Sequence, residues 1–265
     1  MRGSVGQWRA VSGTLPPVPQ CQIYIDKEIT SLRKGGKILR GCLKHVAALV
    51  HPGITTGELD RAAEIFIRKH GGEPAFKGYK GFPATLCISV NEECVHGIPG
   101  KRVLKEGDIV SLDGGVILDG LYTDACVTVP VGRVSKEAQN LICTTDEALA
   151  AALRMVRGGV RVGDISAAIQ RVAEKGGCHP VRSLTGHGVG RALHAFPDIP
   201  NSGKAGTGPV LPVGTVIAIE PILSLGSPEV RCQIDGWTLT ITDGALSAHS
   251  EHTVLVREDG CEVLA

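Results

Sequence analysis

The chain contains 265 residues, with 28 lysines and arginines against 27 aspartates and glutamates and a formal net charge of +1. This balance gives no bulk electrostatic reason to expect binding to nucleic acid or to an anionic membrane. Hydrophobic residues make up 43% and charged residues 21%, as in soluble globular proteins, and no apolar run approaches the ~18 residues that a membrane span requires. The nine cysteines include no C-x-x-C pair and no secretory signal is expected, so we expect reduced thiols in a cytoplasmic protein.

The first residues are expected to form an arm. Residues 1–22 include the run Leu15-Pro16-Pro17-Val18-Pro19 and show no hydrophobic periodicity, which predicts a disordered or extended segment. A polyproline ligand for an SH3-like partner is the alternative interpretation. The sequence does not indicate which role the arm has.

Helical periodicity begins at Asp26. Apolar residues recur at spacings of three and four up to Val50 and predict a helix that ends before Pro52. A second helix is predicted from Thr56, where the sequence resembles a capping arrangement, to the glycine pair that follows residue 70. Two strands are predicted after it, over residues 85–90 and 108–117. Helices and strands together form one α+β unit.

The same order of elements occurs twice. Residues 158–177 repeat the pattern of residues 52–72, and residues 210–220 repeat the pattern of residues 103–113. Stacked arrays generally need three or more repeats, so two copies predict a duplicated domain rather than a solenoid.

The duplication relates two acids to each other. Asp113 and Glu220 occupy equivalent positions, each at the end of an apolar strand. The half-repeats cover residues 26–130 and 132–256 approximately. If the halves pack about a pseudo-twofold axis, both carboxylates face one central cleft.

Four acids in all lie at the ends of apolar strands, namely Asp113, Asp124, Glu220 and Glu251. A carboxylate in such a setting is costly unless it is hydrogen bonded, paired or bound to a metal. A pair of divalent cations is the natural agent for neutralising four of them. His187 lies between glycines, which leave its imidazole accessible to the same site.

His194 and His96 are further candidates for chemistry. The sequence contains no H-E-x-x-H motif, which excludes a zincin, and no G-x-S-x-G motif, which argues against a serine hydrolase. An oxygen-rich ligand set with one histidine suits Mn, Fe or Co, or a catalytic zinc site.

At these residues the sequence resembles the type I methionine aminopeptidases, which have the duplicated pita-bread fold. The motifs that carry the resemblance are Asn91–Pro99, Gly107–Asp124, Gly186–His194, Ile219-Glu220-Pro221, Asp235-Gly236-Trp237-Thr238 and Leu246–Val254. The resemblance implies an α+β, creatinase/aminopeptidase-like fold, with two pseudo-twofold related halves and a central antiparallel sheet covered by helices. It implies a single catalytic domain over residues 23–265.

The resemblance also implies roles for the acids and for His187. Asp113 would chelate one of two divalent metal ions, while His187 and Glu220 would chelate the other. Asp124 and Glu251 would bridge both ions, whose identity among Co, Mn, Fe and Zn the sequence does not reveal. Glu220 would also shuttle a proton from the attacking water to the leaving amine.

Substrate contacts are implied in the same way. His194 would stabilise the carbonyl oxygen as it becomes an oxyanion, and His96 would hydrogen bond to the departing peptide nitrogen. The pocket for the methionine side chain would be formed by Phe76, Tyr79, Phe82, Cys87 and Trp237. Two departures from the family pattern put substrate preference in question, because Phe76 replaces a smaller cysteine and Ala195-Phe196-Pro197 replaces an acidic pair.

The implied activity is that of a methionyl aminopeptidase, a metal-dependent exopeptidase that removes the initiator methionine when the second residue is small. Expected partners are nascent peptides with a free N-terminal methionine, with a transient ribosome contact. We expect a cytoplasmic monomer without nucleic-acid or membrane partners. The alternatives are another pita-bread metallopeptidase, of the prolidase or aminopeptidase P kind, and a non-enzymatic pita-bread binding protein.

Overall fold

The computed structural model describes residues 20–265, so the arm expected over residues 1–22 lies almost entirely outside the described residues. The helices within this range are α1 (Asp26–Ala47), α2 (Thr56–Lys69), α3 (Lys136–Met155) and α4 (Val162–Lys175), with a single 3₁₀ turn, η1 (Tyr79–Gly81). The strands are β1 (Glu73–Pro74), β2 (Leu86–Val90), β3 (Glu93–Val95), β4 (Ile109–Leu118), β5 (Leu121–Pro130), β6 (His179–Pro180), β7 (Thr185–Gly188), β8 (Ala195–Pro200), β9 (Val216–Ile219), β10 (Ile222–Ser224), β11 (Val230–Cys232), β12 (Leu239–Ile241), β13 (Ser247–His249), β14 (Glu251–Val256) and β15 (Cys261–Val263).

The start of α2 illustrates how local sequence defines these elements. The Thr55 hydroxyl accepts a hydrogen bond from the Glu58 N–H at 3.2 Å, and the Glu58 carboxylate accepts one from the Thr55 N–H at 2.9 Å. This reciprocal pair satisfies two N–H groups that the first turn leaves without partners. The N-cap is therefore Thr55, one residue before the predicted start. The helix ends before Gly71, whose φ of 83° suits glycine.

The internal duplication is visible in an isolated β-bridge that occurs once in each half. Thr55 pairs with Val103 in an isolated antiparallel bridge, and Arg161 pairs with Val210 in the same way. Each bridge joins the start of the second helix of one half to the segment that precedes a central strand. Two related halves, as predicted from the repeat, are thus built on one plan.

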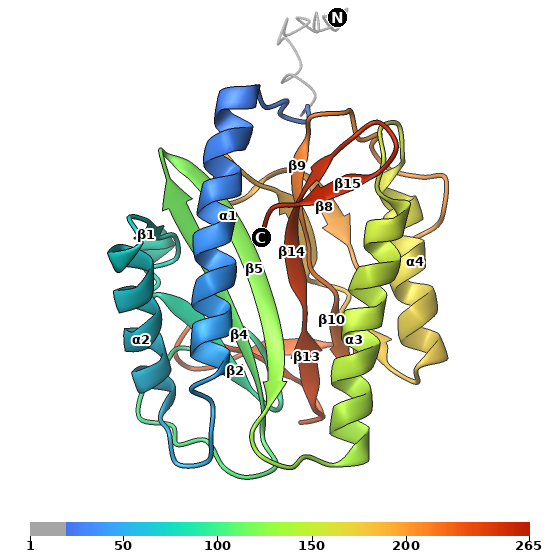
Figure 1. The fold of residues 1–265 in the computed structure, drawn as a ribbon. Coiled ribbons are helices and arrows are strands. Elements are labelled where there is room, and N and C mark those ends of the chain that lie inside the picture. Colours follow the sequence, from blue (N-terminus) through green and yellow to red (C-terminus); the bar gives the residue numbers. More distant parts are fainter. Residues whose placement is uncertain (1–19) are drawn as a thin grey trace, which may run out of the picture.

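The halves join in one nine-stranded sheet. Its main path runs β1-β4-β5-β14-β9-β7-β8, with β2 added beside β4 and β15 beside β14, and the pairings along it are antiparallel. Strands β5 and β14 lie side by side near the middle of Figure 1, where the first half meets the second. The predicted central antiparallel sheet is confirmed.

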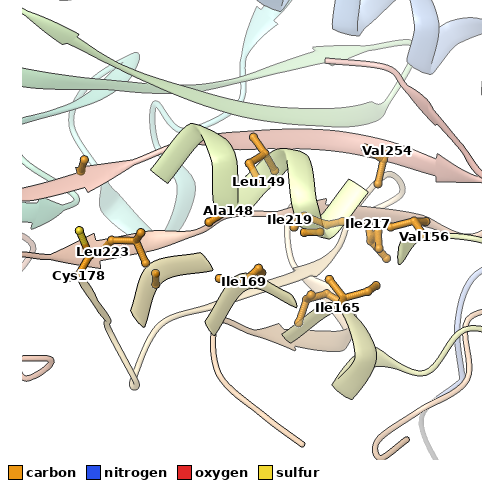
Figure 2. Close-up of a cluster of buried hydrophobic side chains, with 14 of the residues drawn as sticks. Ala148, Leu149, Val156, Ile165, Ile169, Cys178, Ile217, Ile219, Leu223 and Val254 are labelled. Carbon is orange, nitrogen blue, oxygen red and sulfur yellow. The ribbon is translucent and has the colours of Figure 1, made fainter. Parts of the chain in front are cut away.

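Helices pack against one face of this sheet, in front of the strands in Figure 1. In the second half, Ile165 and Ile169 of α4 are fully buried in a cluster with Ile217 and Ile219 of β9 and Val254 of β14 (Figure 2). A second buried cluster joins α1 and α2 to β2 and β4. Burying these apolar side chains is the main driving force for assembling the layers, and it leaves the opposite face of the sheet for polar groups.

Candidate metal centre and substrate pocket

Strand register places three carboxylates in one patch. Asp113 of β4 and Glu251 of β14 are both cross-strand partners of Cys126 on β5. Directly paired residues project to the same face of a sheet, and so do residues two apart on one strand, which adds Asp124 to the patch. The acids that end separate apolar stretches in the sequence therefore converge because three antiparallel strands bring them into one row.

The second half adds two ligands to this patch by the same rule. His187 of β7 pairs with Ala218 of β9, and Ala218 pairs with Thr253 of β14. Glu220 lies two residues after Ala218, and Glu251 lies two residues before Thr253. All of these side chains project to one face. Asp113 and Glu220, related by the repeat, line the same pocket.

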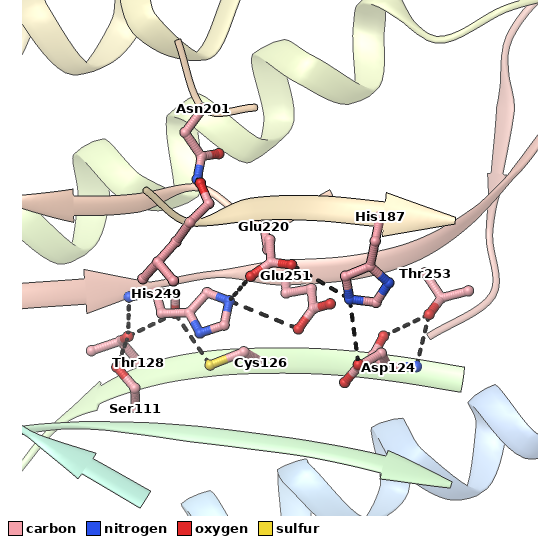
Figure 3. A network of polar contacts seen from close by, with 11 residues as sticks. Ser111, Asp124, Cys126, Thr128, His187, Asn201, Glu220, His249, Glu251 and Thr253 are labelled. Atoms are coloured by element: carbon pink, nitrogen blue, oxygen red, sulfur yellow. Dashed lines mark hydrogen bonds and ion pairs between the residues drawn. The ribbon is translucent and has the colours of Figure 1, made fainter. Parts of the chain in front are cut away.

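The side chains lie close enough to share a cation. The His187 Nε2 atom is 3.5 Å from Glu220 Oε1 and 3.9 Å from Asp124 Oδ2 (Figure 3). One ligand atom each from Asp124, His187 and Glu251 lie within 4.8 Å of one another. Asp124 Oδ1 and Glu251 Oε1 are buried and have no hydrogen-bond partner among the described residues. Unpaired buried carboxylate oxygens beside an imidazole are the donor set that a divalent metal ion needs, so these residues fit such an ion.

The electrostatics of the protein without metal point the same way. Burial raises the pKa of Asp113 to about 7. Burial also raises the pKa values of Asp124, Glu220 and Glu251 well above the usual carboxyl range, and the neighbouring carboxylates add to this rise. For His187, burial lowers the pKa to about 4, which leaves a neutral imidazole at pH 7. Buried acids with raised pKa values beside a neutral imidazole favour the binding of a cation.

Two further histidines border this patch. The His194 ring lies 4.3 Å from the His187 ring between centroids, and its Nδ1 atom is 3.0 Å from the Tyr79 hydroxyl. Burial lowers the pKa of His194 to about 4, so this imidazole is also neutral at pH 7. His96 has a left-handed φ of 58° and lies edge-on to Trp237 at 6.4 Å. Both predicted histidines line the same pocket as the acids.

The pocket is a cavity of about 330 Å³ with an acidic floor and an apolar wall. Its wall contains all five residues predicted for a side-chain pocket, namely Phe76, Tyr79, Phe82, Cys87 and Trp237. They pack together with Leu193, a pocket residue that the sequence did not single out. Phe196 lies elsewhere, in a surface groove with Cys21 and Val210, because it belongs to β8 at the far end of the sheet path. Of the two departures from the family pattern, at Phe76 and at Ala195-Phe196-Pro197, only Phe76 therefore borders the cavity.

His249 is a second pocket residue that sequence reasoning missed. Its Nε2 atom is 3.7 Å from Glu220 Oε2 and 3.8 Å from Glu251 Oε2, and burial lowers its pKa to about 3. One feature of the sequence could have indicated that His249 belongs to the site. It lies two residues before Glu251, and this spacing brings side chains to the same face of an extended segment.

The chain matches Metallopeptidase family M24 over residues 30–258. It belongs to this family. The methionine aminopeptidase of Clostridium perfringens is 49% identical to this M24 peptidase over 239 residues, which cover 90% of the chain and 96% of its relative. Methionine aminopeptidase 1 of Bacillus subtilis is 44% identical over 238 residues, which cover 90% of this chain and 96% of that protein.

Solved structures agree with the M24 assignment. The crystal structure of the methionine aminopeptidase from Thermotoga maritima superposes with a TM-score of 0.91 at 43% identity, covering 92% of this chain and 99% of its own. The Xaa-Pro dipeptidase from Bacillus anthracis has a TM-score of 0.75 at 22% identity, and the match covers 61% of that longer chain. The second similarity shows the shared pita-bread fold alone, and the fold class predicted from the sequence is confirmed.

Proposed function

We propose that this chain is a methionine aminopeptidase that removes the initiator methionine from nascent polypeptides. The observation that carries the proposal is the convergence of Asp113, Asp124, His187, Glu220 and Glu251 on the floor of one pocket whose wall is apolar. A methionine side chain suits that wall, while a free α-amine suits the acidic floor. Similarity to methionine aminopeptidases over nine-tenths of the chain supports the same activity.

We assign the metal ligands as follows. Asp113 would hold one divalent ion, His187 and Glu220 would hold a second, and Asp124 and Glu251 would contact both. Mn, Co, Fe and Zn are all compatible with a mixed oxygen and imidazole set. Two such ions, when bound, act as Lewis acids that lower the pKa of a water and polarise the scissile carbonyl. The buried, unpaired oxygens of Asp124 and Glu251 support the bridging assignment.

The residues of the chain then handle protons and developing charge. Glu220 accepts a proton from the attacking water and delivers it to the leaving amine, a role that suits its place on the pocket floor between His187 and His249. His194, neutral and bordering the acidic floor, donates to the carbonyl oxygen as negative charge develops on it. His96, beside Trp237, accepts a hydrogen bond from the N–H of the departing peptide.

The apolar wall selects the first side chain. Phe82 and Trp237 meet edge to face at 5.2 Å, and Cys87 lies beside them. A flexible thioether adapts to such an enclosure and gains favourable sulfur–aromatic contacts. An N-acetylated peptide lacks the free α-amine that would meet the metal cluster, so we expect the enzyme to act on free N-termini only.

The wider setting follows from this substrate. We expect a monomeric enzyme in the cytoplasm that meets nascent chains as they emerge, with a transient ribosome contact. The described helices include none long and apolar enough to cross a membrane. All nine cysteines are free thiols in the structure, which supports a reducing compartment.

The test is release of free methionine from Met-Ala-Ser, Met-Leu-Ser and Leu-Ala-Ser, with Mn²⁺ or Co²⁺ added and with a chelator. We expect turnover of Met-Ala-Ser, loss of that turnover with the chelator, and no turnover of its N-acetylated form. Efficient hydrolysis of an Ala-Pro dipeptide in place of Met-Ala-Ser would instead favour a prolidase-like enzyme. Absence of hydrolysis with every metal, in protein that binds the metal, would favour a binding protein.

A further inference from the structure

His249 is held at the pocket floor by its own backbone. Its N–H donates to the Thr128 hydroxyl at 2.9 Å, and the Thr128 hydroxyl donates to the His249 carbonyl at 2.7 Å. Thr128 in turn is hydrogen bonded to Ser111 of β4 at 2.7 Å. These contacts tie the end of β13 to two strands of the central sheet. These hydrogen bonds therefore fix the backbone that carries the imidazole to the central sheet.

The ring points at two carboxylates of the second half, those of Glu220 and Glu251. Figure 3 shows Glu220 and Glu251 between the imidazoles of His249 and His187. His187 Nε2 approaches Glu220 Oε1 at 3.5 Å, whereas His249 Nε2 approaches Glu220 Oε2 at 3.7 Å. Each oxygen of the Glu220 carboxylate thus faces a different histidine.

The His249 Nε2 atom is buried and has no hydrogen-bond partner within residues 20–265. Two carboxylate oxygens, at 3.7 and 3.8 Å, are the acceptors before it. When both carboxylates are ionised, as metal ligands are, a lone pair at Nε2 would repel their oxygens, whereas an N–H attracts both, so the tautomer with the proton on Nε2 is the favoured one. Catalytic hydrogen bonds are often long before substrate binds and tighten in the complex.

We propose that His249 is a positioning residue for Glu220, whose Oε2 atom it holds by an Nε2–H hydrogen bond so that Oε1 stays directed at the His187 side of the metal centre. This inference rests on the proposed function, because it assigns Glu220 to both metal binding and proton transfer. Partners of this kind orient a ligand and are worth about 10- to 100-fold in metal affinity or activity.

The test compares His249→Gln with His249→Leu in the full-length protein. The glutamine side chain has an N–H donor at about the same distance from the backbone as Nε2 of histidine. The leucine side chain has a similar volume to histidine but no hydrogen-bond donor. Mn²⁺ affinity is measured by calorimetry in the absence of substrate, and kcat and KM are measured with Met-Ala-Ser. We expect His249→Leu to weaken Mn²⁺ binding by about 10-fold or more and to lower kcat more than it changes KM, while His249→Gln stays within about 3-fold of the wild type.

His252 supplies a matched control on β14, the next strand along the chain. It is a largely buried histidine next to Glu251, but it pairs with Ile219, so it projects to the helix-covered face of the sheet. His252→Leu is expected to retain Mn²⁺ affinity and kcat. If His249→Leu does not fold, His249→Met is measured in its place, because methionine is equally apolar and more adaptable.

Three results would overturn the inference. Wild-type Mn²⁺ affinity and kcat in His249→Leu would show that the imidazole is dispensable. Equal losses in the Gln and Leu variants would show that a donor N–H is not what matters. An equal loss in His252→Leu would show a general effect of removing a buried ring. Because Mn²⁺ affinity is read without substrate, failure of the proposed peptidase activity leaves this comparison intact.

Discussion

The Tyr79 hydroxyl lies 3.0 Å from Nδ1 of His194, although 115 positions separate the two residues in the chain. If the phenol donates this hydrogen bond, the single proton of the neutral imidazole is on Nε2, the atom left to donate to a substrate carbonyl. Tyr79 therefore does more than line the side-chain pocket. Its position is set by the turn η1, where Gly78 and Gly81 both have φ values of 90° that favour glycine.

Tyr79→Phe is predicted to lower kcat for Met-Ala-Ser by about 10-fold, with a smaller change in KM, because His194 loses control of its tautomer while the apolar wall stays in place. Steady-state kinetics with Mn²⁺ check this. Tyr122→Phe is the control, since Tyr122 packs against the same cluster. A larger loss in the control, or an effect on KM alone, would contradict the assignment.

Asp124→Asn is predicted to have opposite effects with and without metal. In Mn²⁺ the variant loses a bridging carboxylate, so kcat falls by about 100-fold or more. In chelator it unfolds at a higher temperature than the wild type, by about 2–4 °C, since it no longer buries an unpaired carboxylate among others. Calorimetric scans in both conditions provide the measurement. Asp259→Asn, at an exposed turn, serves as the reference, and a lower melting temperature of Asp124→Asn in chelator would refute the prediction.

Glu262→Gln is predicted to destabilise the protein in a way that depends on pH. Hydrogen bonds from Arg33 lower the pKa of Glu262 to about 2, and Arg257 adds to the effect. A lowered folded-state pKa stabilises the protein above the unfolded value of about 4.3, and this contribution is lost as pH falls towards 2. Because the pair is partly exposed, we expect only about 0.5–1 kcal/mol at neutral pH.

Urea unfolding of the wild type and Glu262→Gln in chelator measures this difference. The two curves should separate at pH 7, approach each other near pH 3, and also approach each other at high salt, which screens exposed charges. A difference that grows as the pH falls would contradict the sign derived from the pKa.

Phe76→Ala is predicted to relax selection for methionine. Phe76 is 8% exposed and borders the cavity, so the smaller side chain enlarges it. Differences of this size in an apolar pocket change selectivity by about 10-fold, and we expect the preference for Met-Ala-Ser over Leu-Ala-Ser, expressed as a ratio of kcat/KM values, to fall accordingly. Phe196→Ala, in the separate groove, should leave the ratio unchanged.

Residues that belong to repeated or periodic patterns could be predicted from the sequence. The apolar runs that precede Asp113 and Glu220 indicate buried strands, and the duplication relates these two acids before any strand is paired. Capping at Thr55 and the glycine at residue 71 delimit α2 to within a residue or two. These features are local, or are copies of local features, so no knowledge of the sheet order is needed.

Other parts of the site depend on long-range pairing. That β14 inserts between β5 and β9 is not encoded in any short pattern, yet it brings Glu251 opposite Cys126. His249 escaped notice because Ser250 separates two short strands and obscures their alternation. The contact of Tyr79 with His194 requires η1 and the segment before β8 to meet across the pocket. Such contacts follow from tertiary packing, which single-sequence patterns do not contain.

The pairing of β5 with β14 has a consequence for how the enzyme can be divided. Asp113 and Asp124 lie in the first half, while the other three assigned ligands lie in the second, and the short 131–135 connection joins the halves. Neither half carries a complete ligand set. Fragments separated in this connection are each expected to be inert, and hydrolysis is expected to return only when they reassociate along β5 and β14. Methionine release would then serve as a readout of fragment complementation.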